Sequence, residues 1–173
     1  MRSSPVFHCF EKLIRERTQS VLDDLPVGEE FDWVENVSVE LTTRMLATLF
    51  GFPYEDRARL KRWSDVATAT PGGGIIESEE QRREELLECV GVFLGLWNQR
   101  VNQPPQFDFI SMLAHGESTK NMDMMEYLGN LILLIVGGND TTRNTMSASV
   151  LALHENPDQF QRLQQDPALI PGM

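Results

Sequence analysis

The stretch LILLIVGGNDTTR, residues 131–143, decides how this chain is read. A run of apolar residues passes directly into two glycines, an amide, an acid and two hydroxyls. A glycine inside a helix costs about 1 kcal/mol relative to alanine, and Asp and Thr compete there for backbone hydrogen bonds. The surrounding segment, Asp123 to Glu155, nevertheless contains no proline and starts with a capping-box pattern. A local conflict of this kind is typical of a functional site.

Two structures are compatible with the segment. As one helix it would be about 50 Å long, and the two glycines would let it open as a kink or a wide turn. One face would then carry an apolar wall, a gap, and an acid beside a hydroxyl, which suits a dry pocket with a proton-delivery pair. The residues on that face are Leu133, Val136, Gly137, Asp140 and Thr141. Alternatively, residues 137–140 form a loop between two shorter helices, because Asn, Asp and Gly favour turns.

The rest of the chain is also predicted to be helical. Apolar residues recur at helical spacing between clear breaks at Gly51–Pro53, Pro71–Gly74 and Pro104–Pro105. We expect helices over residues 11–25, 37–50, 54–69, 78–102, 109–114 and 158–165. Neither strands nor repeats are visible, so the fold class is mainly α, and a helical bundle is the simplest architecture.

Composition excludes several classes of protein. The net charge of −11 over 173 residues argues against nucleic-acid binding. Two cysteines, Cys9 and Cys89, cannot build a disulfide framework, and no signal peptide is visible, so we expect a cytoplasmic protein. The longest apolar run is too short for a transmembrane segment, which needs about 20 residues. His8, His115 and His154 lack metal-ligand spacing and are predicted to lie near the surface.

Residues 137–143 resemble the oxygen-binding motif of the central helix of cytochromes P-450, commonly Ala/Gly-Gly-x-Asp/Glu-Thr-Thr/Ser. Asn156-Pro157 resembles the dipeptide that starts the next helix of that family. The stretches FDW at 31–33, LTTRMLATLF at 41–50 and PGGGII at 71–76 resemble the bacterial alkane and fatty-acid terminal (omega) hydroxylases of this superfamily. The resemblance extends from about residue 11 to residue 170.

The resemblance implies one partial cytochrome P-450 domain over residues 1–173. It would be the central helical part of that fold, with helices around a long oxygen-activating helix at 123–155, truncated before the heme-binding loop. Residues 54–102 match the lid helices over the substrate channel, with the glycine-rich loop either as a hinge or as a plain surface linker. Residues 1–10 match nothing in the family.

The resemblance also implies roles for individual residues. Thr141 matches the threonine that supports dioxygen binding and proton delivery, and Asp140 matches the adjacent acid. Gly137 and Gly138 match the small pair beside the distal face of the heme, where dioxygen binds, while Leu133 and Val136 would line the substrate pocket. The heme-ligating cysteine loop is absent, so we expect no metal ligand in this chain and no activity of the fragment alone. Cys89 is predicted to be a small core or boundary residue.

The implied function is a heme-dependent monooxygenase that inserts one atom of O2 into an unactivated C–H bond. Terminal hydroxylation of medium-chain alkanes or fatty acids is expected, with electrons from NAD(P)H through a ferredoxin reductase and a ferredoxin. One alternative is a cytochrome P-450 acting on another apolar substrate, such as a terpene or a steroid. A second is a non-enzymatic helical binding module, in which residues 137–142 form a turn. A continuous helix through Gly138 would separate the enzyme from the binding module.

Overall fold

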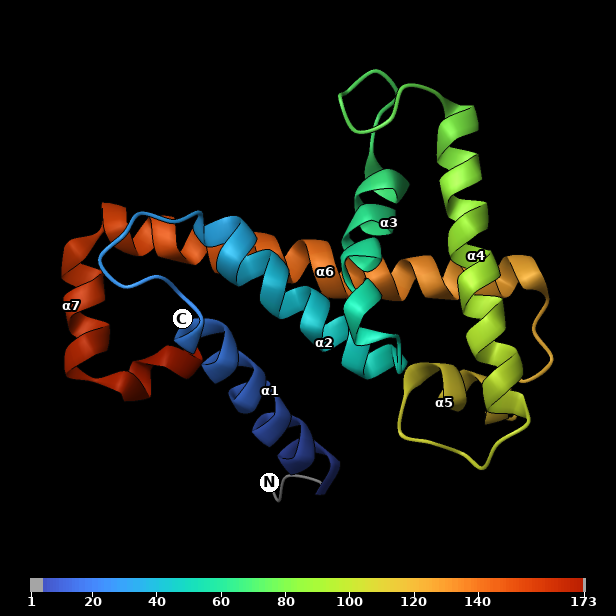
Figure 1. Ribbon diagram of the computed structural model, residues 1–173. Coiled ribbons are helices and arrows are strands. Elements are labelled where there is room, and N and C mark those ends of the chain that lie inside the picture. The colour runs from blue at the N-terminus through green and yellow to red at the C-terminus, as the bar shows by residue number, and fades with distance from the viewer. Residues whose placement is uncertain (1–4, 173) are drawn as a thin grey trace.

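The computed structural model describes residues 5–172, with side chains from Phe10 onward. Over this range the chain forms helices and no strand, which confirms the mainly α prediction. Helix α6 runs unbroken from Met124 to Glu155, through both glycines (Figure 1). The loop predicted as the alternative for residues 137–140 is therefore wrong. So is the chain reversal at Asn139 that the binding-module alternative required.

The other helices follow the predicted pattern with shifted ends. The 37–50 helix starts as a π-helical turn, and the 54–69 helix starts as a separate 3-10 turn. Helix α6 does not open at its glycines, contrary to the prediction. The one π-helical segment among the described residues is η1, which lies before α2. In chain order the remaining elements are α1 (Pro5–Asp23), η1 (Val34–Val39), α2 (Glu40–Phe50), η2 (Tyr54–Asp56), α3 (Ala58–Thr68), α4 (Glu79–Val101), α5 (Phe109–His115), α7 (Pro157–Gln165) and η3 (Pro167–Gly172).

Local signals in the sequence fix the helix ends. The Asp123 carboxylate accepts a hydrogen bond from the backbone N–H of Glu126 at 2.8 Å, and this bond caps α6. At α4 the Ser78 hydroxyl accepts from the N–H of Gln81 at 3.2 Å. Gly51 ends α2 in the left-handed conformation, with φ of 58°, which favours glycine.

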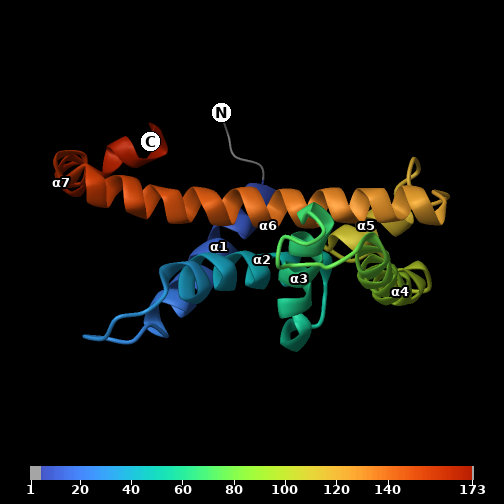
Figure 2. The same ribbon diagram turned by 90° about the horizontal axis from the view of Figure 1, so that it is seen from above.

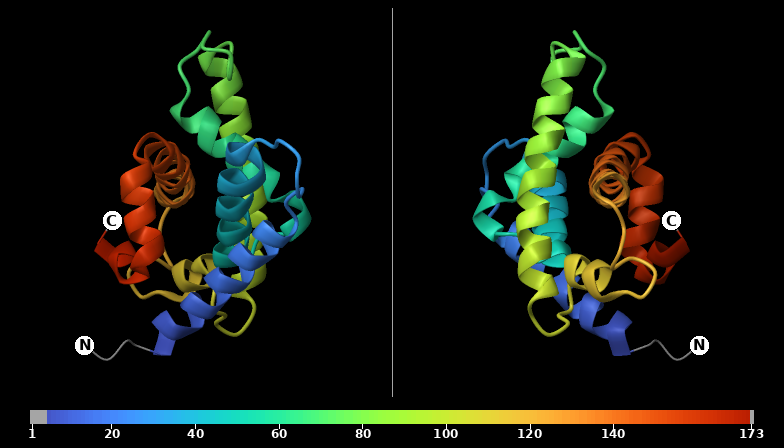
Figure 3. Two further views of the ribbon diagram at one scale, coloured as in Figure 1. Left: turned by 90° about the vertical axis from the view of Figure 1, so that its left-hand side faces the viewer. Right: turned by 90° about the vertical axis from the view of Figure 1, so that its right-hand side faces the viewer.

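Helix α6 is the axis of the molecule. Helices α2 and α3 cross it on one side, and α4 lies beside α3 (Figures 1 and 2). Beyond the C-terminal end of α6, α7 and η3 turn back along the other side (Figure 3). Because α3 and α4 cross α6 steeply instead of running alongside it, the arrangement differs from a simple bundle of parallel helices.

The core lies where these helices cross. An aromatic cluster joins the end of α2 to α3 and α4, with ring centroids of Phe50 and Phe93 5.4 Å apart and those of Phe52 and Trp63 6.0 Å apart. Cys89 is fully buried beside this cluster, which confirms it as a core residue. Such dense packing under α6 holds that helix in a fixed position.

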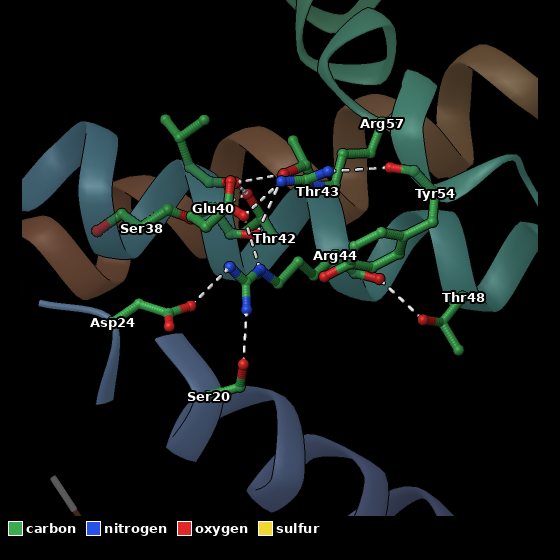
Figure 4. Close-up of polar contacts among 11 residues, drawn as sticks. Ser20, Asp24, Ser38, Glu40, Thr42, Thr43, Arg44, Thr48, Tyr54 and Arg57 are labelled. Carbon is green, nitrogen blue, oxygen red and sulfur yellow. Dashed lines mark hydrogen bonds and ion pairs between the residues drawn. The ribbon is translucent and has the colours of Figure 1, made fainter. Parts of the chain in front are cut away.

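A charged cluster fastens α1 to α2. The Arg44 guanidinium lies between Glu40 on its own helix and the polar groups at the end of α1 (Figure 4). Its Nε donates to Glu40 Oε1 at 2.6 Å, and its Nη1 donates to the Ser20 hydroxyl at 3.0 Å. Arg57 donates to the same Glu40 oxygen at 2.7 Å. Glu40 thus links α2 to the start of α3.

Helices α3 and α4, which the sequence analysis assigns to a lid, are tied to each other. Arg62 bonds to both carboxylate oxygens of Glu85, at 2.6 and 2.7 Å, and Arg59 bonds to Glu88 at 2.6 Å. The hydrogen bond from Arg62 lowers the pKa of the Glu85 carboxyl. The hinge assigned to the loop between these helices stays a prediction, but these bonds favour movement of α3 and α4 together.

No helix between residues 5 and 172 is long and apolar enough to span a membrane.

Candidate functional site

Helix α6 presents two different faces over the motif. Its buried face consists of Tyr127, Leu131, Ile135 and Asn139, which pack against α2, α3 and α4. Its open face carries Leu133, Gly137 and Thr141, all exposed, with 72% of Leu133 accessible. Val136 and Asp140 are half-buried along one edge of the open face. The continuous helix thus places five of the predicted site residues on one side, as their spacing requires, whereas Gly138 faces α2.

The two glycines of the motif lie in different surroundings. A Cβ added to Gly137 would meet no atom within 4 Å, so this position leaves the open face flat. A Cβ added to Gly138 would lie 2.8 Å from Leu46 Cδ2, so glycine allows α2 to approach α6 closely here. The contact gives a packing reason for Gly138, and its predicted role toward dioxygen stays a prediction.

Thr141 has its hydroxyl hydrogen engaged within the helix. Its Oγ1 donates to the carbonyl oxygen of Gly137 at 2.7 Å, and the side chain is exposed on the open face. The lone pairs of Oγ1 remain able to accept a hydrogen bond from a molecule bound there. Thr145, one turn later, makes the same kind of bond to Thr141 at 2.8 Å.

Asp140 is held by an arginine that the sequence analysis did not single out. Its Oδ1 lies 2.5 Å from Arg143 Nη2, and Arg143 Nη1 lies 3.3 Å from Asp65 of α3. The carboxylate is 35% exposed, so it is less enclosed than an acid inside a dry pocket would be. The i, i+3 spacing of Asp140 and Arg143 is the signal that would have predicted the pair.

Asn139 was also missed as a structural residue. It is fully buried, and its amide contacts the hydroxyl of Thr42 on α2 at 2.9 Å. Both partners lie in stretches that the sequence analysis quoted, but single-sequence reasoning has no means of pairing residues 97 positions apart. Asn139 and Arg143 therefore anchor the motif to two neighbouring helices.

The described residues provide a surface for a flat cofactor but no ligand for its metal. The absence of a side chain at Gly137 leaves the open face accessible to a planar group such as heme. Burial raises the pKa of the Cys89 thiol to about 12, so it stays protonated in the core, away from this face. No cluster of His, Cys, Asp and Glu suited to a metal occurs between residues 5 and 172. The side chains of His8 and Cys9 lie outside the described part.

The remaining histidines do not contribute to the site. His115 ends α5, where its Nδ1 lies 2.8 Å from the carbonyl oxygen of Ser111, and it is half-buried. His154 is exposed near the end of α6. Both positions agree with the surface or boundary location predicted from the sequence.

Comparison with known proteins identifies relatives along nearly the whole chain. A family model described as cytochrome P-450 matches residues 12–169. The linalool 8-monooxygenase of Pseudomonas putida is 32% identical over 161 residues, which are 92% of this chain and 39% of that protein.

Two solved structures have a higher sequence identity to this chain than that protein has. Cytochrome P-450-153 from Novosphingobium aromaticivorans superposes with a TM-score of 0.81 and 48% identity, over 97% of this chain and 40% of that one. A family-153 protein from Sphingomonas sp. PAMC 26605 gives a TM-score of 0.85, also with 48% identity, over 98% of this chain and 42% of that one. The chain therefore spans about two fifths of the length of the relatives it matches.

Proposed function

The chain belongs to the cytochrome P-450 family, and from this premise we propose that the intact protein is a heme-dependent monooxygenase that hydroxylates the end of a linear apolar substrate. The observation that carries the proposal is the unbroken α6, which presents Gly137 and Thr141 on an open face backed by a packed core. The heme would lie against this face, with its ligand supplied from outside the described residues. When bound, heme supplies the activation of dioxygen.

The residues of α6 would supply positioning and protons. Thr141 Oγ1 would accept one hydrogen bond at the open face, since its own hydrogen is already donated to the Gly137 carbonyl. Asp140 would deliver protons toward Thr141 through an ordered water. Arg143 would hold the Asp140 carboxylate at the edge of the face, because the two are already paired.

The substrate class is proposed from the resemblance and from the chemistry of the open face. Leu133 and Val136 offer aliphatic contacts and no charge partner, which suits an alkane or the tail of a fatty acid. Both family-153 structures are 48% identical to this chain, and the sequence stretches at 31–33, 41–50 and 71–76 resemble the terminal hydroxylases. Residues 54–102 would then cover the substrate channel as a lid.

A terpene is the second candidate substrate. The relative named for 8-monooxygenation of linalool is 32% identical to this chain, so this substrate class has direct but weaker support. For either substrate, electrons would come from NAD(P)H through a ferredoxin reductase and a ferredoxin in the cytoplasm.

Product analysis tests the proposal. The intact protein is supplied with a ferredoxin and its reductase and offered octane, dodecanoic acid, linalool and a bulky polycyclic compound in parallel. Hydroxylation of the linear substrates at the last carbon is the expected result. Preferential turnover of linalool would favour the terpene alternative, and exclusive oxidation of a bulky polycyclic compound would contradict both.

A further inference from the structure

Polar side chains cross the apolar contact between α2 and α6. Four residues form this polar seam: Ser38, Thr42, Asn139 and Ser147. The Thr42 and Asn139 side chains meet at 2.9 Å, and the Ser147 hydroxyl lies 2.9 Å from that of Ser38. Ser38 and Thr42 lie on successive turns of η1 and α2 (Figure 4). Leu46 and Ile135 are the buried apolar neighbours in the same core.

The hydrogen bonds available around Thr42 indicate how the Asn139 amide is oriented. The Thr42 hydroxyl has one hydrogen but three oxygens within reach: the carbonyls of Ser38 and Val39 at 2.9 and 3.1 Å, and Asn139 Oδ1 at 2.9 Å. Meanwhile the buried Asn139 Nδ2 has no partner. If the amide is turned over, Nδ2 donates to Thr42 Oγ1, which donates to the Ser38 carbonyl. Amide oxygen and nitrogen are interchangeable in shape, so this orientation satisfies the donor without moving an atom of the backbone.

Helix geometry connects the amide to the open face. Successive residues turn by about 100° around an α-helix, so residues two positions away point roughly opposite. Gly137 and Thr141 are each two positions from Asn139. When Asn139 points into α2, both therefore point away from it, toward the open face, as their exposure shows.

We propose that Asn139 is a positioning residue, whose bond to Thr42 fixes the rotation of α6 and so keeps Gly137 and Thr141 on the open face. A buried polar group at an otherwise apolar helix contact lowers stability but selects one register. A leucine would fill the same space without leaving a polar group to satisfy, so packing alone does not explain an amide here. The inference rests on the proposed function, since Thr141 must act at that face.

The test changes α2 and measures chemistry at α6. In the intact, heme-loaded protein, Thr42→Val keeps the size of the side chain and removes the hydroxyl, at a position outside the open face. The share of electrons lost to peroxide is expected to rise by roughly 2- to 10-fold, which lies at the lower end of the interaction energies between residues in contact. Thr42→Ser keeps the hydroxyl and is expected to retain wild-type coupling of electrons to product.

Thr43 offers a matched control. It is as buried as Thr42, but its hydroxyl bonds only to carbonyls of its own helical segment, at 2.8 and 3.1 Å. Thr43→Val therefore removes the same atoms without removing a hydrogen bond to α6, and coupling is expected to stay at the wild-type value. Equal peroxide yields in Thr42→Val and Thr43→Val would overturn the inference, because the effect would then be general loss of packing.

A second pair of variants guards against misfolding. Asn139→Leu removes the other partner, and the double variant with Thr42→Val is expected to lose no more coupling than either single variant. Additive losses would overturn the inference, and if Thr42→Val does not fold, Asn139→Leu alone is compared with Thr43→Val. Thr141→Ala distinguishes failure of the positioning role of Asn139 from failure of the proposed function. If it uncouples the enzyme while Thr42→Val does not, only the positioning role fails; if it has no effect, the proposed function fails first.

Discussion

The two faces of α6 differ in what holds their residues in place. On the buried face, each side chain has neighbours from other helices, and even the amide of Asn139 has a hydroxyl partner. On the open face, Thr141 bonds only to its own helix, and Gly137 has nothing beside it. Asn139 is thus held by contacts with α2, whereas Gly137 and Thr141, two positions away on either side, remain accessible to a bound molecule. We expect substitutions on the two faces to have separable effects on stability and turnover.

The largest expected effect concerns Cys89, whose thiol lies in the core and not on the open face. Burial raises the pKa of this thiol to about 12. The 173-residue chain mixed with hemin is therefore expected to show no thiolate-type band in a reduced, carbon-monoxide difference spectrum. Cys89→Ser should leave that spectrum unchanged. A clear thiolate band in the wild-type chain would contradict the assignment, and Cys9→Ser would then show whether Cys9 supplies the ligand.

On the open face, Thr141→Ala is expected to separate electron use from product formation in the intact protein. Removing the hydroxyl takes away a proton partner, and such assistance is worth roughly 100- to 10,000-fold at most. Product should fall within that range or below it while peroxide rises and electron consumption continues. Thr145→Ala is the matched control, because Thr145 makes the same backbone bond one turn away. Equal effects of the two substitutions would show that Thr141 has no special role in proton delivery.

Asp140→Asn should have a smaller effect than Thr141→Ala and a different one. The amide keeps the shape but cannot release a proton, so turnover is expected to slow, by up to about 100-fold, without being diverted to peroxide. Asp65→Asn controls for the ion pair, because Arg143 contacts both carboxylates but Asp65 lies on α3. Steady-state rates and coupling ratios of the two variants provide the measurement. If Asp65→Asn slows turnover equally, the charge of the pair matters and the proton does not.

The sequence predicted the helices well because their signals are local. Apolar spacing, the caps at Ser78 and Asp123, and the stop at Gly51 each act within a few residues. Composition alone left residues 137–140 open between a loop and a helix, and the family resemblance implied the helix. The contact of Gly138 with Leu46, which accompanies that helix, is tertiary and could not be predicted from one sequence. Apart from Gly138, the predicted site residues share a face because spacing fixes angles along a helix. The partners Thr42 and Asp65 could not be predicted, because their pairing depends on how distant helices cross.

The two adjacent glycines allow the faces to be compared within one dipeptide. Gly138→Val is expected to lower the free energy of unfolding by about 1–3 kcal/mol, because the new side chain overlaps Leu46. Gly137→Ala meets open space and removes a helix-destabilising glycine, so stability should rise by up to about 1 kcal/mol. Turnover of Gly137→Ala should nevertheless fall, since its methyl narrows the open face. Denaturant unfolding and product formation of the intact protein measure both effects, and equal destabilisation by the two variants would refute the distinction.

The smallest expected effect is a change in stability caused by substitution of Glu40, at the start of α2. Burial raises the pKa of its carboxyl, but hydrogen bonds and charges of Arg44 and Arg57 outweigh it, so the pKa is lowered. A group whose pKa is lower in the folded state contributes stability that is fully present above the unfolded value, about 4.3, and is lost as the pH falls through the folded value. Glu40→Gln should therefore be less stable than the wild type at neutral pH.

That difference should shrink as the pH is lowered below about 4.3, because the carboxyl of the unfolded chain then takes up a proton, whereas the folded chain, in which the pKa is lowered, does so only at a lower pH. Denaturant unfolding of both proteins, from pH 7 down to the lowest pH at which the wild type stays folded, provides the measurement. Glu117→Gln serves as the control, since Glu117 pairs with Lys120 at the surface, 2.9 Å away, and exposed pairs contribute only about 0–1 kcal/mol. A stability gap between Glu40→Gln and the wild type that widened in acid would have the opposite sign to the one that the arginine pairing requires, and would show that burial dominates at Glu40.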